Sequence, residues 1–431
     1  MTVQRTAANP ALDQAEPLTV DGAYARARHA ALTPSEVGPV GLELEAHLVD
    51  LDAVADRVTW DRIDRLAGCV GVAAGACALS FEPGGQLELS GPPGPDILAA
   101  VAELRDRGDR ARLALADLRL GMAHAGSDPL RPPRRVNPRP RYRAMEQHYA
   151  ATGRARPAAV MMNSTAAMQV NLEAGAEEAW AQRVARAYRL GPTLAAISAS
   201  SRWLGGCDTG WKSARQRAWS GLDPRACGPV PGCVAADPGS DAALDPASAW
   251  ARFALRAPVA FVRTRGGETG AVGAPVPFEA WAAGAVRLGG RCPTAADLEI
   301  HLTTLFPPVR LRGYLELRYL DMTAPRWWPA IAAVVTTLMD DPVAADIATE
   351  AAEPASQRWT EAARDGLGDP VLARSARRCV AVAAQRAPSG LAQAVAELAE
   401  LVETGRCPGD LIAERITDIG PRAAFEELAH A

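Results

Sequence analysis

Four short segments of this sequence alternate apolar and polar residues, and each carries acidic or amide side chains on its polar side. The segments are Val40–Asp50, Phe81–Gly91, Ala167–Glu173 and Tyr314–Asp321. Alternation with a period of two is typical of a β-strand with one buried face, so each segment is predicted to be a strand. If the four strands share one sheet and bury their apolar faces in one core, their polar faces meet on one surface.

That shared surface would be strongly acidic. It would collect the following carboxylates, amides and one arginine: Glu43, Glu45, Glu88, Glu316, Gln169, Asn171 and Arg318. Crowded carboxylates repel one another unless cations lie between them, and hard divalent ions such as Mg²⁺ or Mn²⁺ prefer oxygen ligands. The pattern therefore favours a metal-binding basin, and the competing interpretation is a sheet whose acidic faces are simply solvated.

The run Glu82-Pro83-Gly84-Gly85 is unusual for the start of a strand. Proline removes a ladder donor, and paired glycines suit a bulge or a close approach of the backbone to a ligand. Glu82 is a candidate metal or substrate contact, with a turn-capping role as the alternative. Asn171 is likewise a candidate for a nucleotide or metal contact.

Composition limits the class of protein. The 431 residues are 48% hydrophobic, enough for one large domain or two smaller ones, and the net charge of −4 argues against a basic nucleic-acid binder. The N-terminus has no apolar signal sequence, and the longest apolar run, near 330–339, is too short to cross a bilayer. The eight cysteines form no CxxC motif. A cytoplasmic protein with free thiols is expected, with no membrane or nucleic-acid partner.

Helical patterns separate and follow the predicted strands. Asp96–Gly121 is predicted to be a long amphipathic helix with an apolar stripe that includes Leu113, and the chain from Pro342 to its end is predicted to be almost entirely helical. Between them, Ser127–Arg143 is rich in proline and arginine, and its arginines suit either an anionic ligand or a solvated loop. Separated strands with helices between them favour an α+β fold with a mostly antiparallel sheet.

Six motifs occur in an order that resembles the glutamate–cysteine ligases, in particular the branch that includes the plant enzymes and a group of bacterial ones. They span about two-thirds of the chain, and the second is highly specific. The motifs are GLELE at 41–45, EPGGQLELSG at 82–91, RYRAMEQHYA at 141–150, MMNSTAAMQVNLE at 161–173, SARQRAW at 213–219 and YLELR at 314–318.

The resemblance implies a fold and an activity. The fold would be a glutamine-synthetase-like, curved, mostly antiparallel sheet that forms the active-site basin, flanked by helices. The catalytic domain would span 18–341, and a helical C-terminal segment, 342–431, would pack on it. The activity would be ATP-dependent joining of the γ-carboxylate of L-glutamate to the amine of L-cysteine through a γ-glutamyl phosphate, with Mg²⁺ or Mn²⁺ bound.

The resemblance also assigns roles to residues. Arg318 would hold the transferred phosphoryl group, with Glu316 beside it in the catalytic set, and Arg215 would bind substrate glutamate, with Arg217 as the nearby alternative. Gln169 occupies a position that is histidine in more distant bacterial members. The implied metal ligands are Glu43, Glu45, Glu88, Glu316 and Gln169.

One bacterial branch of this family supplies γ-glutamylcysteine to ergothioneine synthesis, and the chain resembles that branch most. Two alternatives remain at this point. One is a carboxylate–amine ligase of the same fold with a different amine acceptor, and the other is a non-catalytic member that binds nucleotide or metal. The sequence predicts no particular oligomeric state.

Overall fold

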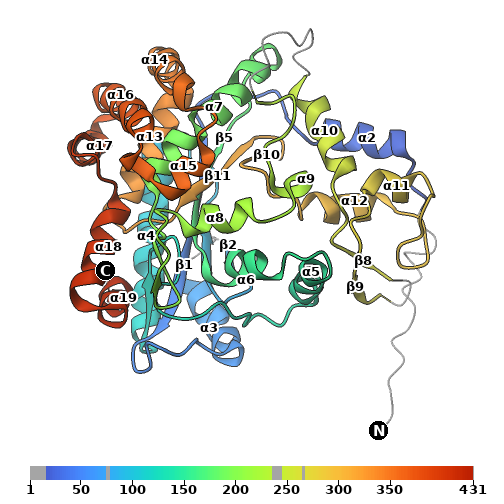
Figure 1. Cartoon of the computed structure of the whole chain (residues 1–431), viewed down its shortest axis with the longest axis horizontal. Coiled ribbons are helices and arrows are strands. Elements are labelled where there is room, and N and C mark those ends of the chain that lie inside the picture. Colours follow the sequence, from blue (N-terminus) through green and yellow to red (C-terminus); the bar gives the residue numbers. More distant parts are fainter. Residues whose placement is uncertain (1–15, 74–77, 235–244, 265–266, 431) are drawn as a thin grey trace.

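A seven-stranded sheet runs through the molecule, and helices pack around it (Figure 1). The computed structural model describes residues 16–73, 78–234, 245–264 and 267–430. The strands of this sheet are β1 (Val40–Asp50), β2 (Ala78–Phe81), β3 (Leu87–Ser90), β4 (Leu120–Ala123), β5 (Ala167–Leu172), β10 (Val309–Leu311) and β11 (Leu315–Asp321). They lie in the order β10-β11-β5-β1-β3-β2, and β4 pairs with the last residues of β1. All these pairings are antiparallel, so the predicted sheet is confirmed.

Strand β1 lies at the centre and has the bounds predicted from its alternation. Leu42, Leu44 and Ala46 are buried in the core, while Glu43 and Glu45 lie on the opposite face. Its two main neighbours, β3 and β5, bring their own polar residues onto that same face, because paired strands in register present the same face at opposed positions.

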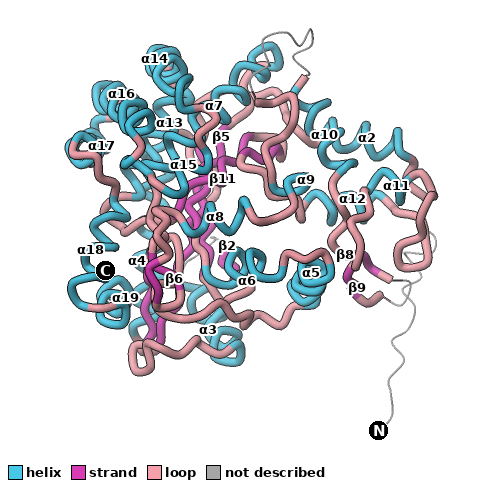
Figure 2. The backbone as a smooth tube through the Cα atoms, in the orientation of Figure 1, coloured by secondary structure: helices cyan, strands magenta, loops and turns pink. Residues whose placement is uncertain are grey.

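Helices occupy both sides of the sheet, and Figure 2 distinguishes them from the strands by colour. The N-terminal half contains α2 (Val20–His29), α3 (Trp60–Ala73), α4 (Ile97–Ala116), α5 (Pro140–Ala151), α6 (Ala155–Ser164), α7 (Trp180–Ser198) and α8 (Ala214–Ser220). Then follow α9 (Pro224–Cys227), α10 (Pro246–Arg256), α11 (Phe278–Ala282), α12 (Ala295–Leu302) and α13 (Trp328–Asp340). The apolar face of the sheet contacts α4, α7 and α13, whereas α5, α6 and α8 contribute side chains that face its polar surface.

Two short hairpins lie outside the main sheet. One joins β6 (Trp203–Leu204) to β7 (Cys207–Asp208), and the other joins β8 (Phe261–Arg263) to β9 (Thr269–Ala271).

The prediction of one continuous strand over Phe81–Gly91 is wrong. The segment is the turn and second strand of a hairpin, because the chain reverses between β2 and β3. The N–H of Glu82 donates to the carbonyl of Gln86 at 2.8 Å, and Gly85 has a φ of +84°, which glycine adopts without strain. The predicted close backbone approach occurs at Gly84, but its neighbour is the backbone of Asn163.

The predicted helix Asp96–Gly121 is too long at its C-terminal end. Helix α4 stops at Ala116, the chain turns at Arg119 with a φ of +58°, and β4 begins at Leu120. Leu113 is 70% exposed and does not belong to the buried stripe of the helix. The prediction failed because an apolar residue near helical spacing does not by itself establish burial.

The chain after Pro342 is helical, as predicted. It forms α14 (Pro342–Ala352), α15 (Trp359–Arg364), α16 (Pro370–Arg386), α17 (Ser389–Glu403), α18 (Pro408–Ile419) and α19 (Pro421–His430). Buried apolar residues of α14, α16 and α17 belong to the same core cluster as those of the sheet. A boundary between 341 and 342 remains a prediction. Within the described residues no helix is both long and apolar enough to cross a membrane.

The turn between β2 and β3 supplies a test of the packing. A Cβ atom added at Gly84 would overlap the backbone of Asn163. We expect Gly84→Ala to lower the free energy of unfolding by roughly 1–3 kcal/mol, because two backbone segments would have to separate. Gly368→Ala is the matched control, since a Cβ there meets no atom within 4 Å. Urea denaturation of both variants makes the measurement, and equal stability of the two would contradict this packing.

Candidate active site

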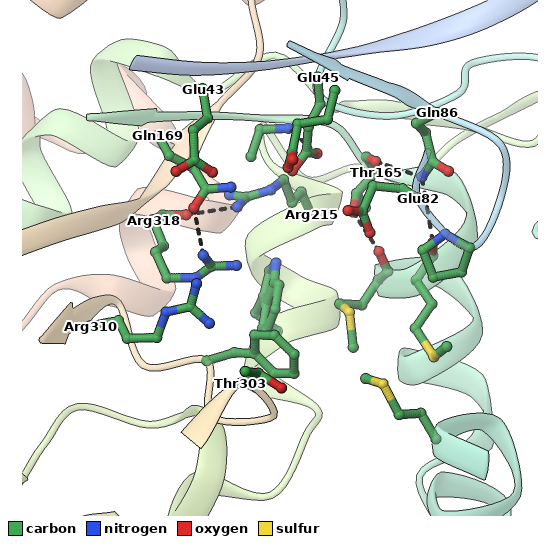
Figure 3. A pocket seen from close by; sticks show the side chains of 18 of the residues that line it. Glu43, Glu45, Glu82, Gln86, Thr165, Gln169, Arg215, Thr303, Arg310 and Arg318 are labelled. Atoms are coloured by element: carbon green, nitrogen blue, oxygen red, sulfur yellow. Dashed lines mark hydrogen bonds between the residues drawn. The ribbon is translucent and has the colours of Figure 1, made fainter. Parts of the chain in front are cut away.

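The polar face of the sheet forms one side of a cavity of about 310 Å³ (Figure 3). Strands β1, β3, β5 and β11 each contribute to its lining, so the structure brings residues from all four predicted segments together. The other walls come from the turn after β2, from α5, α6 and α8, and from residues 303–312. The cavity is therefore built from segments that are distant in sequence and joined through the sheet.

Three carboxylates line the cavity from adjacent strands. Glu43 and Glu45 belong to β1, and Glu88 of β3 lies directly opposite Glu45 in the strand register. Each accepts at least one hydrogen bond from the surrounding chain. The N–H of Ala167 donates to Glu45 at 2.7 Å, and the hydroxyl of Ser80 donates to Glu88 at 2.9 Å. These contacts fix the carboxylates in place but supply no positive charge.

Burial and mutual repulsion govern the charge of this group. Burial, followed by the neighbouring Glu88, raises the pKa of Glu45 to about 7. Burial also raises the pKa of Glu43, and Glu316 and Glu88 add to the effect. A cation between the carboxylates would relieve both costs at once.

The donor set suits a hard divalent cation, because carboxylate oxygens are its preferred ligands. In the ranges that the structure describes, no three His, Cys, Asp or Glu side chains are already arranged to hold a metal ion. Glu43, Glu45 and Glu88 nevertheless share one face of adjacent strands, and Glu45 and Glu88 are directly opposed there. The chemistry of the residues present therefore fits a divalent cation.

Asn171 lies beside this group and is not part of the cavity lining. Its side-chain amide donates to Glu43 at 2.9 Å, and thus holds one candidate ligand in position.

Glu316 behaves differently from the other acidic candidates. It is fully buried and does not line the cavity. Arg310 donates to both of its oxygens, and the bond from Nη2 to Oε1 is 2.8 Å long. Nη1 of Arg318 lies 3.2 Å from the same Oε1 atom. Burial alone would raise the pKa of Glu316, but Arg318 and Arg310 outweigh it and lower the pKa to about 2. Both of its oxygens are thus engaged by arginines, so it holds those arginines in place, and a role as metal ligand remains a prediction.

Arg318 reaches from β11 into the cavity (Figure 3). Its guanidinium donates to the side-chain oxygen of Gln169 and faces the ring of Phe306, 5.5 Å from the ring centroid. Gln169 also lines the cavity, opposite Glu43 in the strand register. In this arrangement the amide oxygen of Gln169 is engaged by the arginine.

The two arginines of α8 have different positions. Arg215 is buried and lines the cavity, and it donates to the backbone carbonyl of Arg318 at 2.7 Å. Arg217 is exposed, lies over the ring of Trp211 and does not line the cavity. Residues two apart on a helix point in nearly opposite directions, so one helix face carries only one of them to the site.

Glu82 lines the cavity from the turn after β2. Burial, Glu88 and Glu45, in that order, raise the pKa of Glu82 to about 8. Gln86, at the end of the same turn, donates to the carbonyl of Thr165 at 2.8 Å and ties the turn to the start of β5.

The remaining wall is largely apolar and was not predicted from the sequence. It contains Tyr142 and Met145 of α5, Met161 and Met162 of α6, Trp219 of α8 and the loop residue Phe306. All of them except Phe306 lie within the motifs that carry the family resemblance, but no role could be assigned to them, because apolar residues on helices have the same pattern whether they face a core or a cavity. Arg141, from the Ser127–Arg143 segment, lines the cavity, and whether it meets an anionic ligand there remains a prediction. Arg310 and Arg312 were also missed.

Comparison with known proteins gives a consistent result. Glutamate–cysteine ligase EgtA of Mycobacterium tuberculosis (strain ATCC 25618 / H37Rv) is 45% identical over 431 residues, which cover 99% of this chain and 98% of the relative. The protein of the same name from Mycolicibacterium smegmatis is 49% identical over 400 residues, 92% of each chain. The chloroplastic glutamate–cysteine ligase of Medicago truncatula is 30% identical over 274 residues, 63% of this chain and 52% of the relative.

The fold has a counterpart among solved structures. A glutamate–cysteine ligase from Francisella tularensis, crystallised in complex with AMP, aligns with a TM-score of 0.56 at 14% identity, over 92% of this chain and 88% of that one. The family profile described as glutamate–cysteine ligase family 2 matches residues 39–429. The resemblance inferred from six short motifs is thereby confirmed, and the chain belongs to glutamate–cysteine ligase family 2.

Proposed function

We propose that this protein is an ATP-dependent glutamate–cysteine ligase. It joins the γ-carboxylate of L-glutamate to the amine of L-cysteine and releases ADP and phosphate. Family membership and the relatives named glutamate–cysteine ligase EgtA support the proposal. The single observation that carries it is structural: the carboxylates of Glu43, Glu45 and Glu88 line one cavity together with the guanidinium of Arg318.

The reaction needs such a cavity because an amine does not displace the oxygen of a free carboxylate. ATP first converts the γ-carboxylate to an acyl phosphate, and the amine of cysteine then displaces phosphate. Two anions, the carboxylate and the γ-phosphate of ATP, must therefore be brought together. Glu43, Glu45 and Glu88 would hold Mg²⁺, which neutralises phosphate charge when it is bound.

Arg318 supplies the positive charge that the protein itself contributes to phosphoryl transfer. A guanidinium stabilises the charge on the phosphoryl oxygens, and it acts best when it is already oriented. Here the orientation comes from Glu316 and Gln169, which both contact Nη1 of the guanidinium. Glu316 contributes to catalysis by holding Arg318, and Arg310 fixes Glu316 in turn.

Arg215 is placed to bind a carboxylate of substrate glutamate. Its buried Nη1 atom has no acceptor within 3.5 Å in the described part of the chain, the carboxylate of Asp321 being 3.6 Å away, and the residue lines the cavity. A buried donor without a partner is costly, and an anionic ligand would satisfy it.

The apolar wall suits the side chain of the second substrate. Three methionines, Met145, Met161 and Met162, lie together there, and thioethers pack well against a small polarisable group such as a thiol. This supports cysteine over a charged or bulky amine acceptor. On the strength of the EgtA relatives, we also propose that the product, γ-glutamylcysteine, enters ergothioneine synthesis.

Product identification tests the function directly. We expect the protein, incubated with ATP, Mg²⁺, L-glutamate and L-cysteine, to form γ-glutamylcysteine, detected by mass spectrometry, with one ADP released for each product molecule. A panel of other amino acids in place of cysteine should give little ADP. If another amine acceptor is used faster, the fold and metal chemistry stand but the substrate assignment does not. If ADP never appears, the catalytic proposal itself is wrong.

A second prediction concerns Arg318, the residue proposed to stabilise the transferred phosphoryl group. Arg318→Ala should lower kcat by about 10³-fold, the usual cost of losing an arginine that stabilises phosphoryl transfer, and should change the KM for ATP much less. Arg217→Ala removes an exposed arginine outside the cavity and is the matched control, expected to retain wild-type kinetics. Steady-state ADP release measures both. Similar losses in the two variants, or an Arg318→Ala effect confined to KM, would assign Arg318 to binding instead.

A further inference from the structure

Asp321, the last residue of β11, is a buried carboxylate that does not line the cavity. Three donors hold it. The N–H of Ser200 and the hydroxyl of Ser201 donate to one of its oxygens at 3.0 and 2.6 Å, and the hydroxyl of Ser213 donates to the other at 3.0 Å. A carboxylate with this many donors has one fixed orientation.

The same carboxylate faces Arg215, with its Oδ1 atom 3.6 Å from Nη1 of the guanidinium. Two further contacts hold this arginine: its Nη2 donates to the carbonyl of Arg318 at 2.7 Å, and its backbone N–H donates to Ser201 at 3.1 Å. Asp321 thus positions the backbone of Arg215 through Ser201, and its carboxylate faces the positive charge of the guanidinium.

The surroundings of Asp321 are built to fit it. Ser213 caps the N-terminus of α8, so the carboxylate of β11 is tied to the helix that carries Arg215. On another side, a Cβ atom at Gly126 would lie 2.8 Å from Cβ of Asp321, so the space is open only because this residue is glycine.

A buried guanidinium needs a negative partner, and the carboxylate that Arg215 faces is that of Asp321. Asp321 stabilises its charged form most, and Glu45 comes next. Glu45 is also a proposed metal ligand, so an arginine drawn toward it would compete with the cation. A fixed carboxylate paired with Arg215 reduces that competition.

We propose that Asp321 is a positioning residue that holds Arg215 toward the substrate carboxylate and away from the metal-binding carboxylates. The inference rests on the proposed function, because it assumes that Arg215 binds glutamate. Asp321 touches neither substrate nor nucleotide, and acts only through the arginine.

The first test is Asp321→Asn, which keeps the size of the side chain and removes its charge. We expect the KM for glutamate to rise roughly 10–100-fold, the range found for residues that hold metal ligands in place, while the KM for ATP changes much less. The matched control is Asp297→Asn, which breaks another buried arginine–aspartate pair, with Arg291, outside the cavity. That variant should retain the wild-type KM for glutamate. An unchanged KM in folded Asp321→Asn would overturn the proposal.

A double-mutant cycle separates positioning from general structural damage. If Asp321 acts through Arg215, adding Asp321→Asn to Arg215→Ala should raise the KM for glutamate no further. Equal effects in both backgrounds would overturn the proposal. If Asp321→Asn fails to fold, Ser213→Ala, which removes one donor to the carboxylate, should raise the same KM by a smaller factor, and no rise there would be equally decisive.

Assays of the wild-type protein test the proposed ligase function separately from the positioning role of Asp321. Wild-type protein that forms γ-glutamylcysteine, together with an Asp321→Asn variant of unchanged KM, contradicts the positioning role alone. Wild-type protein that forms no product, and shows no binding of glutamate by calorimetry, contradicts both.

Discussion

The electrostatic repulsion among carboxylates on one face of a sheet is the constraint on which this site depends. Glu45 and Glu88 face each other across two paired strands, and Glu43 lies two residues along. Strand pairing fixes their backbones, so the three side chains leave the same small area of the sheet. The charge has to be met by protons or by cations. Burial first, and then the charge of Glu88, raises the pKa of Glu45 to about 7.

The protein neutralises some of its acidic residues and leaves others free. Glu316 is matched by Arg310 and Arg318, and Asp321 by Arg215 and three hydrogen-bond donors. These pairs orient the arginines that line the cavity. Among the described residues, Glu43, Glu45 and Glu88 have no such arginine partner, and they are the group left available to a metal ion. The division follows from strand register and places the proposed phosphate-binding arginines beside the proposed metal-binding carboxylates.

Much of this could be predicted from the sequence where the signal is local. Eleven alternating residues define β1 and place Glu43 and Glu45 on one face. The role of Arg310 could not be predicted, because its pairing with Glu316 depends on the register of β10 and β11, which no local pattern specifies. The choice between Arg215 and Arg217 needed the orientation of α8, and the methionines of the apolar wall needed the packing of α5 and α6. The Pro-Gly-Gly run was recognised as unusual, yet only the hairpin contacts show that it reverses the chain.

The central claim is that Glu43, Glu45 and Glu88 converge on divalent cations. Mn²⁺ can replace Mg²⁺ at oxygen-ligated sites and scatters X-rays anomalously, so its position can be observed directly. In crystals grown with Mn²⁺ and ADP, the account predicts an anomalous peak within coordination distance of Glu45 and Glu88, absent from crystals of the Glu88→Gln variant. A peak elsewhere, or an occupied nucleotide site with no metal between these carboxylates, would contradict it.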